Sequence, residues 1–294
     1  MRQRNCQFSI IHCSVHCQFS IFNYQLLIAK PNAAWINCQF SIINYQLSLT
    51  MYGSEKVLPY NQKEHKGVQV RRMFDAIAGK YDVLNHTLSF GFDKGWRRRG
   101  IRFLRPFAPK QILDIATGTG DLAIEMQRIL GAERIIGADI SEGMMQIGRE
   151  KVARAGWQDH IVFEQQDCTA LTYADDSFDA VTAAFGVRNF EDIERGLSEM
   201  YRVLKPGGHL MILELSTPEH FPMKQLYSIY SRVVIPNIGR LISKEKAAYS
   251  YLPASIKVVP QGKVMEGLLS RVGFKEAKAH TLTFGICSLY TGSK

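Results

Sequence analysis

Long apolar runs and a cysteine framework are both missing from this sequence of 294 residues. No apolar stretch is long enough to cross a bilayer, so no membrane-spanning helix is predicted. Only two of the six cysteines, Cys168 and Cys287, lie beyond residue 50, which predicts a reducing cytoplasmic location without disulfides. Charged residues make up 21% of the chain and aromatic residues 11%, which predicts a folded protein rather than a disordered one.

Acidic residues are absent from residues 1–50, although this stretch holds four of the six cysteines. The sequence CQFSI begins there at residues 6, 17 and 38, but the copies are fragmentary and lack the turn chemistry of stacked repeats. Four residues of metal-ligating type occur together, His12, Cys13, His16 and Cys17. No second ligand pair follows at zinc-finger spacing, and the apolar stretches are too short for a secretory signal. We interpret 1–50 as an N-terminal extension, with Met51 as the physiological start, and predict no metal site.

Basic residues exceed acidic ones only modestly in the rest of the chain. The formal charge falls from +9 for the whole sequence to +6 from Met51 onward, where 33 Lys and Arg face 27 Asp and Glu. This balance does not require a nucleic-acid partner. It suits weak docking at the inner face of an anionic membrane, for which the cluster Arg97-Arg98-Arg99 is the candidate.

After residue 50, the sequence predicts helices first and then alternating strands and helices. Apolar residues recur at helical spacing through residues 51–108, which predicts a helical cap. Residues 109–294 alternate short apolar runs with helical segments, interrupted by a Tyr-rich, helix-like insertion at 218–259. The expected strands are 111–116, 134–140, 161–166, 178–185, 209–215, 277–283 and 286–290. This order predicts an α/β fold with a mostly parallel, seven-stranded sheet and ligands at the carboxyl ends of its strands.

A glycine-rich loop follows the first expected strand and opens a helix. It contains Gly118, Thr119 and Gly120, and glycines there let the backbone approach a nucleotide closely. Asp139 ends the second strand 19 residues after Gly120, where its carboxylate can accept hydrogen bonds from ribose hydroxyls. Asp167 closes the third strand and can accept from an adenine amino group.

The same loop also fits the dinucleotide pattern G-x-G-x-x-G/A, so NAD is an alternative ligand. Asp114 argues against NAD, because a carboxylate inside the first strand would repel a diphosphate but attract a cationic sulfonium amino acid. Cys168 has no His or Lys beside it in sequence to activate a nucleophilic thiol, so we expect it to line the adenine pocket. Ala184, at the end of the fourth strand, completes the predicted set of cofactor-binding residues.

Residues 111–216 resemble the class I S-adenosylmethionine methyltransferases, which have a Rossmann-like fold. Longer motifs are similar to the ubiquinone/menaquinone biosynthesis C-methyltransferases, and this resemblance extends from Met51 to the C-terminus. The matching segments are FDAIAGKYDVLN (74–85), LSFG (88–91), FGVRNF (185–190), YRVLKPGG (201–208) and YSYLPASI (249–256).

The resemblance implies methyl transfer from S-adenosylmethionine to a ring carbon of a polyprenylated quinol. The expected step is the conversion of demethylmenaquinol, a naphthoquinol, to menaquinol, with the benzoquinol precursor of ubiquinone as the alternative acceptor, although no single residue separates the two. The oligomeric state stays open. Arg188 is implied as a catalytic residue; because arginine is not deprotonated in proteins, we interpret it as a quinolate stabiliser or a water-orienting group. The alternative is a structural ion-pair arginine. Tyr81, Asp82 and Asn85 are candidates for closing the cap over the substrate, with structural capping as the alternative.

Two further expectations concern partners. The apolar stripe of the 218–259 insertion is a candidate wall for a prenyl-tail channel, although such stripes more often serve packing. A nucleic-acid substrate is not expected, because Phe185-Gly186-Val187-Arg188-Asn189 stands where amino-group DNA and RNA methyltransferases carry an Asn/Asp-Pro-Pro-aromatic motif.

Overall fold

The computed structural model describes residues 52–60, 62–235, 237 and 246–294. The chain divides into two units, Met1–Tyr45 and Gln46–Lys294. The first unit, the extension at 1–50 and its four metal-type residues lie outside the described residues, so those expectations stay untested. Everything below concerns the second unit.

A seven-stranded sheet forms the centre of this unit, in the order β3-β2-β1-β4-β5-β7-β6. The strands are β1 Gln111–Ile115, β2 Arg134–Asp139, β3 Ile161–Gln165, β4 Phe178–Ala184, β5 Leu204–Leu215, β6 Lys275–Leu282 and β7 Cys287–Ser293. Strands β1 to β5 pair in parallel, whereas β7 runs antiparallel to both β5 and β6. The predicted fold class and all seven strands are therefore confirmed.

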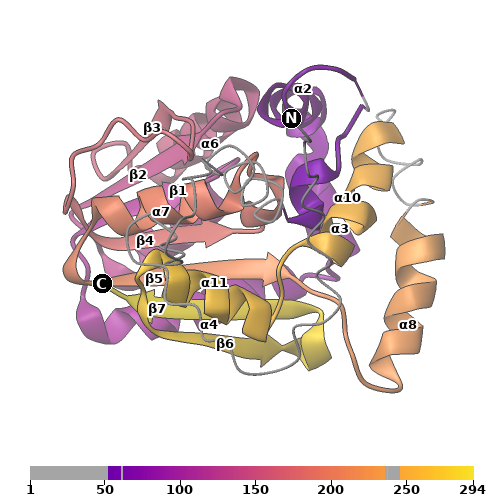
Figure 1. Ribbon diagram of the computed structural model, residues 1–294. Helices are drawn as coiled ribbons and strands as arrows, with labels where there is room; N and C mark the ends of the chain where they lie inside the picture. Colours follow the sequence, from indigo (N-terminus) through magenta and orange to yellow (C-terminus); the bar gives the residue numbers. More distant parts are fainter. Residues whose placement is uncertain (1–51, 61, 236, 238–245) are drawn as a thin grey trace, which may run out of the picture. The chain divides into compact units, whose positions relative to one another are not determined.

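Helices cover both faces of the sheet (Figure 1). Their bounds are α2 Lys66–Ile77, α3 Tyr81–Leu88, α4 Phe92–Leu104, α5 Asp121–Leu130, α6 Glu142–Ala155, α7 Ile193–Val203, α8 Met223–Ile229, α10 Lys246–Val258 and α11 Lys263–Val272. Apolar side chains of α7 and α11 pack in one core cluster, and those of α4, α5 and α6 pack in another on the opposite face. This arrangement is the doubly wound sheet that alternating strands and helices predict.

Shorter helical turns join these elements. The 3-10 helices are η2 Gly53–Lys56, η3 Ala78–Lys80, η4 Arg105–Phe107, η5 Val187–Asn189 and η7 Thr283–Gly285, and η6 Tyr230–Val234 is a π-helix. The described residues of 51–108 contain η2, α2, η3, α3, α4 and η4, and the described part of the 218–259 insertion contains α8, η6 and α10. Helices α2, α3 and α10 lie beside the carboxyl ends of the parallel strands (Figure 1).

Local chemistry explains where two of these elements begin. The Ser141 hydroxyl accepts a hydrogen bond from the Met144 amide at 3.2 Å, as expected for the N-cap of α6. Helix α7 ends at Val203 and the chain enters β5 directly at Leu204, so this strand begins earlier than the expected strand at 209–215. The register against β4 shifts between Phe178 and Ala180, and residues 205–208 form an irregularity within β5.

Candidate active site

The glycine-rich loop connects β1 to α5 at the carboxyl edge of the sheet. Gly118 and Gly120 have φ angles of +58° and +75°, in the left-handed region that glycine adopts without strain. A Cβ atom on Gly120 would lie 2.6 Å from the ring of Phe163. Glycine is therefore required at Gly120 by both its conformation and its surroundings.

Asp139 holds this loop in place from the end of β2. One of its carboxylate oxygens accepts from the Gly118 amide at 2.8 Å and the other from the Ser141 amide at 2.9 Å. Burial raises the pKa of Asp139, although these amide hydrogen bonds oppose the rise. The carboxylate still has lone pairs available, so it can accept further hydrogen bonds from a ligand.

A cavity of about 360 Å³ opens between the strand ends and α2. Five of the eight residues predicted to bind the cofactor line it: Gly118, Asp139, Asp167, Cys168 and Ala184. Cys168 is partly buried, and desolvation raises the pKa of its thiol well above the ordinary value. A thiol of this kind is not an activated nucleophile, which agrees with its expected role as a lining residue.

The remaining three predicted residues support the loop from behind and are not in the cavity wall. Asp114 is buried, and its carboxylate accepts hydrogen bonds from Thr117 and Thr182, both at 2.7 Å. Burial raises the pKa of Asp114 to about 6. The Thr119 hydroxyl donates to Asp82 at 2.5 Å, and Gly120 packs against β3.

Helix α2 forms the other wall of this cavity, and sequence reasoning missed it. Gly67, Val70, Arg71 and Phe74 line the cavity from this helix. Its helical spacing was visible in the sequence, but spacing alone does not distinguish a helix that covers a ligand from one that packs on a core.

A second cavity of about 250 Å³ adjoins the first, and Tyr81 and Phe185 line both. The three predicted catalytic residues, Arg188, Tyr81 and Asn85, all contribute to its wall. Its other walls come from α3, α4 and the 218–259 insertion and are mostly apolar. They include Leu88, Trp96, Leu226, Tyr227, Leu252 and Ile256.

Arg188 forms a buried ion pair with Glu214 of β5. Its Nη1 lies 2.7 Å from one carboxylate oxygen, its backbone amide donates to the other at 3.0 Å, and only 6% and 1% of the two side chains are exposed. Nη1 also donates to the Phe185 carbonyl, whereas Nε has no partner among the described residues. Burial is the largest single influence on the pKa of Arg188 and lowers it, but the charge and hydrogen bond of Glu214, together with Tyr81 and Tyr251, raise the pKa overall. The guanidinium therefore stays charged beside the second cavity.

Glu214 was not predicted, although the sequence carried a signal. It is the one acidic residue in the expected strand at 209–215, and a carboxylate in a buried strand needs a partner. The ion pair also means that the structural alternative for Arg188 is present in the molecule. The two roles are compatible, because Arg188 also lines the second cavity.

Phenolic side chains surround Arg188. Burial raises the pKa of Tyr227 to about 12 and also raises the pKa values of Tyr81 and Tyr251, in each case against the lowering effect of the Arg188 charge. These hydroxyls are neutral at physiological pH. They can donate hydrogen bonds in the cavity, but they are not bases there.

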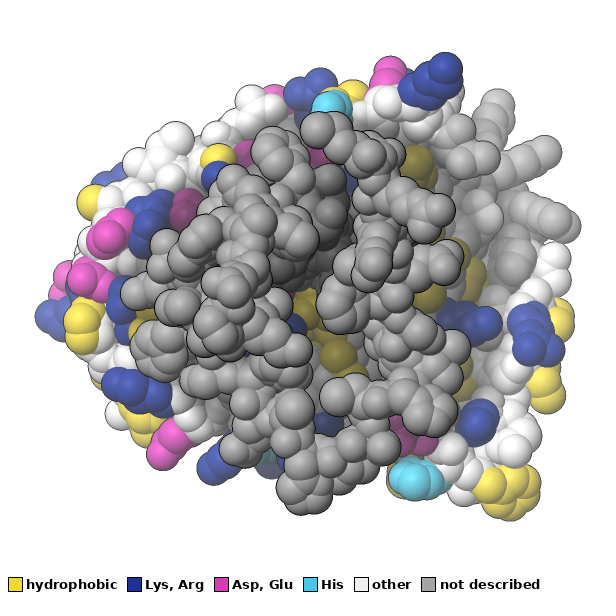
Figure 2. Space-filling model, in the orientation of Figure 1, with side chains coloured by type: hydrophobic (Ala, Val, Ile, Leu, Met, Phe, Trp, Pro, Cys, Tyr) yellow, Lys and Arg dark blue, Asp and Glu magenta, His cyan; other side chains and the backbone are white. Residues whose placement is uncertain are grey.

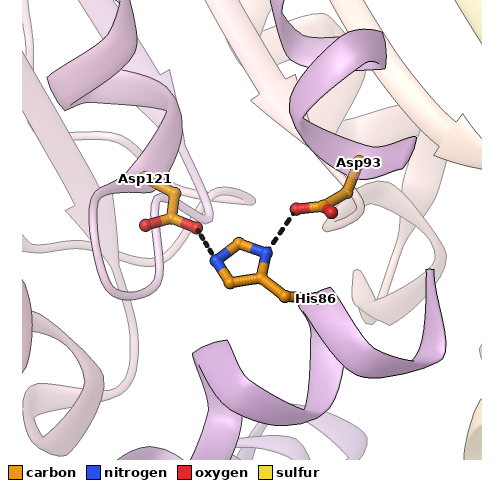
Figure 3. Close-up of side chains that lie close together, drawn as sticks. All are labelled: His86, Asp93 and Asp121. Carbon is orange, nitrogen blue, oxygen red and sulfur yellow. Dashed lines mark hydrogen bonds and ion pairs between the residues drawn. The ribbon is translucent and has the colours of Figure 1, made fainter. Parts of the chain in front are cut away.

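An ion-pair network links the cap to the loop of the first cavity. The His86 ring lies between two aspartates, with Nδ1 2.8 Å from Asp93 and Nε2 3.6 Å from Asp121 (Figure 3). Arg97 lies 2.6 Å from Asp93 and 3.2 Å from Asp121, and Lys151 also pairs with Asp121. Arg97 and Lys151 already neutralise the carboxylates of Asp93 and Asp121. We therefore interpret the cluster as an ion-pair network rather than a metal site.

The same contacts correct the expected role of the basic cluster. Arg97 is buried and paired within the protein, and Arg98 pairs with Glu125 at 2.8 Å. Arg97 is therefore not available for a surface contact, whereas Arg98 and Arg99 remain exposed. On the face shown in Figure 2, Lys and Arg side chains of the described residues are interspersed with Asp and Glu.

Residues 60–294 match the family model described as the ubiE/COQ5 methyltransferase family. The chain belongs to this family. A relative from Bacteroides fragilis named demethylmenaquinone methyltransferase is 58% identical over 243 residues, which cover 83% of this chain and 99% of the relative. A relative of the same name from Porphyromonas gingivalis is 49% identical over 245 residues, covering 83% and 100%.

The fold of this ubiE/COQ5 family member also occurs in solved structures. A SAM-dependent methyltransferase from Thermotoga maritima, described as a possible histamine N-methyltransferase, matches with a TM-score of 0.52 at 19% identity. The match covers 76% of this chain and 99% of that chain, and it shows a shared fold. The family resemblance drawn from the sequence motifs is confirmed.

Proposed function

We propose that this protein transfers a methyl group from S-adenosylmethionine to a ring carbon of a polyprenylated naphthoquinol, converting demethylmenaquinol to menaquinol. The adjoining cavities carry this proposal, because Tyr81 and Phe185 form part of the wall of both. One cavity is bordered by strand-end carboxylates and the other by a guanidinium among apolar side chains. The names of the relatives at 58% and 49% identity favour the naphthoquinol over the benzoquinol.

The residues of the first cavity fit S-adenosylmethionine. Asp139 has the acceptor capacity for ribose hydroxyls, and Asp167 has it for an adenine amino group. Cys168 and Ala184 offer small walls, and Gly118 lets the backbone approach closely. When bound, this cofactor supplies an electrophilic methyl group on its sulfonium. Asp114, Thr119 and Gly120 act by holding the loop.

The second cavity would stabilise the anionic form of the quinol. A quinol that loses its hydroxyl proton delocalises charge onto the ortho carbon, which is the carbon to be methylated. Arg188 would stabilise that charge, and its unpartnered Nε is the kind of buried donor that an anionic oxygen satisfies. Tyr81 and Asn85 would orient the ring, and the apolar walls exclude water and receive the start of the prenyl tail.

We also propose that the mouth of the second cavity contacts the inner face of the membrane. Phe90, Phe92 and Leu226 line this cavity and are 73%, 55% and 55% exposed. Lys224 and Arg232 are exposed on the same insertion, and no acidic residue occurs between them. This surface replaces the Arg97-Arg98-Arg99 cluster as the candidate contact. Among the described residues no helix has the length and apolar character to span a membrane.

Methyl transfer in vitro tests the function. The purified chain is incubated with methyl-labelled S-adenosylmethionine and, separately, demethylmenaquinol, a benzoquinol precursor and total RNA. We expect label in the naphthoquinol, with Arg188→Met as the inactive comparison. Label in RNA, or in none of the acceptors, would contradict the proposal, and label in the benzoquinol alone would reassign the acceptor.

Co-sedimentation with vesicles tests the membrane contact. We expect the chain to bind vesicles that contain an anionic lipid, and a Phe90→Ser, Phe92→Ser variant to bind them less. Phe107→Ser is a matched control, because Phe107 is 47% exposed but lines neither cavity. Equal binding by all three proteins would contradict this contact surface.

A further inference from the structure

Lys66, the first residue of α2, has a buried ammonium that the proposed chemistry does not use. The residue is 3% exposed. Its Nζ donates to three backbone carbonyls, those of Ser54 at 2.8 Å, Phe190 at 2.9 Å and Arg188 at 3.0 Å. An ammonium has three donors and no acceptor, so each N–H has one carbonyl partner.

These hydrogen bonds join α2 to the turn that carries Arg188. Two of the three acceptors are carbonyls of the turn that contains η5, one of them belonging to Arg188 itself. Neighbours of Lys66 reinforce the junction through Glu191, which accepts from the Gly67 amide at 3.2 Å and lies 2.9 Å from the His65 ring. The start of α2 and the Arg188 turn are thus held together at several points.

The last part of α2 is attached on the opposite side of the first cavity. Asp75 accepts hydrogen bonds from the Ser141 hydroxyl at 2.5 Å and from the Gly143 amide at 3.1 Å, both at the start of α6. Between these attachments, Val70 and Phe74 line the cavity. The helix that covers the methyl donor is therefore tied directly to the turn that carries Arg188.

Burying an ammonium costs desolvation free energy, so its hydrogen bonds must offset that cost. Burial lowers the pKa of Lys66 to about 8, although the Glu55 charge opposes this. The Glu55 carboxylate is itself engaged by the amides of Ile193 and Tyr52. An apolar side chain would avoid the desolvation cost but would leave three carbonyls without their donor. What the ammonium adds is three directed hydrogen bonds from one atom.

We propose that Lys66 is a positioning residue for Arg188: its three hydrogen bonds hold the turn at 187–190 so that the guanidinium faces the acceptor cavity while α2 covers the methyl donor. This inference rests on the proposed function. It assigns Lys66 no contact with either substrate.

Replacement by an isosteric side chain without donors provides the first test. In Lys66→Met we expect kcat for the quinol to fall about 10- to 100-fold, because small displacements of a reacting group have effects of that order. We expect KM and the dissociation constant of S-adenosylhomocysteine to change less than about 3-fold. Lys63→Met is the matched control, since Lys63 is exposed in the same segment. A folded Lys66→Met with native kcat would overturn the proposal.

The pH profile separates positioning from a merely structural role. When Lys66 loses its proton as the pH rises through about 8, the amine keeps only two N–H donors and the turn loses one hydrogen bond. We expect kcat of the native protein to decline over that range, and we expect this decline to be absent in Lys66→Arg, which keeps its charge. The same decline in both proteins would count against Lys66.

Amide hydrogen exchange keeps the test independent of catalysis, and its second comparison does not need the Met variant. With S-adenosylhomocysteine bound, we expect exchange at 187–190 to be at least about 10-fold faster in Lys66→Met than in Lys63→Met. If Lys66→Met does not fold, the native protein at pH 7 and pH 9 is compared with Lys66→Arg at the same positions. Absence of methyl transfer by the native chain would contradict the proposed function, whereas unchanged exchange at this turn would contradict the role of Lys66.

Discussion

The two cavities are built from the sequence in different ways. The first is assembled largely from the ends of successive strands, so its residues follow one another at regular intervals, as Gly118, Asp139 and Asp167 do. The second draws on α3, the turn after β4 and the 218–259 insertion, which are far apart in the chain. A ligand site at consecutive strand ends is set by topology, whereas a site between separate helices depends on how those helices pack.

The largest effect is expected at Arg188 in the second cavity, where a substitution should change kcat without changing ligand binding in the first cavity. Arg188→Lys should lower kcat about 100- to 1000-fold, because an ammonium cannot reproduce the directed donors of the guanidinium. The dissociation constant of S-adenosylhomocysteine, measured by calorimetry, should stay within about 3-fold of the native value. Arg98→Lys, at an exposed ion pair, is the control. A near-native rate for Arg188→Lys would leave Arg188 with its structural ion pair only.

The second prediction concerns the buried carboxylate behind the first cavity. Burial raises the pKa of Asp114 from 3.8 to about 6, so between these values the folded state holds a proton that the unfolded state has lost. The contribution of Asp114 to the free energy of unfolding therefore falls as the pH rises through this window. Relative to Asp114→Asn, the native protein should lose about 2 kcal/mol from pH 4 to pH 6.

Urea unfolding at several pH values measures this difference. Asp159→Asn is the control, because Asp159 is exposed and its replacement should leave the pH dependence unchanged. If native protein and Asp114→Asn kept a constant difference in unfolding free energy, Asp114 would not be titrating in this range.

The third prediction concerns Asp139 in the first cavity, where a substitution should change ligand affinity rather than kcat. Asp139→Ala should weaken S-adenosylhomocysteine binding about 10- to 50-fold, the usual effect of removing hydrogen bonds to a charged group. Under saturating methyl donor, kcat should change much less than in Arg188→Lys. Calorimetry with Asp159→Ala as the control measures the affinity. A loss of kcat with unchanged affinity would place Asp139 in the chemistry and would end the separation between the cavities.

The smallest effect is expected at the ion-pair network around His86, which links the helical cap to the loop of the first cavity. His86→Gln removes a partly exposed ring from between Asp93 and Asp121 and should cost about 1 kcal/mol of stability. The corresponding drop in Tm is about 2 to 4 °C, measurable by calorimetry. His160→Gln, at an exposed histidine between α6 and β3, should be neutral. Equal melting of both variants would mean that His86 adds nothing to the network.

Particular residues show how far the sequence predicts this protein. Seven strands and five residues of the first cavity follow from periodicity and strand-end position. Lys66, Glu214 and α2 as a cavity wall were missed, because a lysine or glutamate in a helix or strand reveals its partner only after folding. Arg97 was misread for the same reason: three consecutive arginines look like a surface cluster until a helix buries one of them.

The sequence by itself determined the fold class, the family and the position of the glycine-rich loop, since these depend on local patterns that the backbone repeats at regular intervals. Only the tertiary structure decided which charged side chains pair with buried groups inside the protein and which line the cavities. Arg188 pairs with Glu214, Arg97 with Asp93, and Lys66 with three carbonyls. Each partnership, apart from the one within α4, spans elements distant in the chain, and electrostatic and hydrogen-bond energies depend on distance in space rather than on separation in sequence.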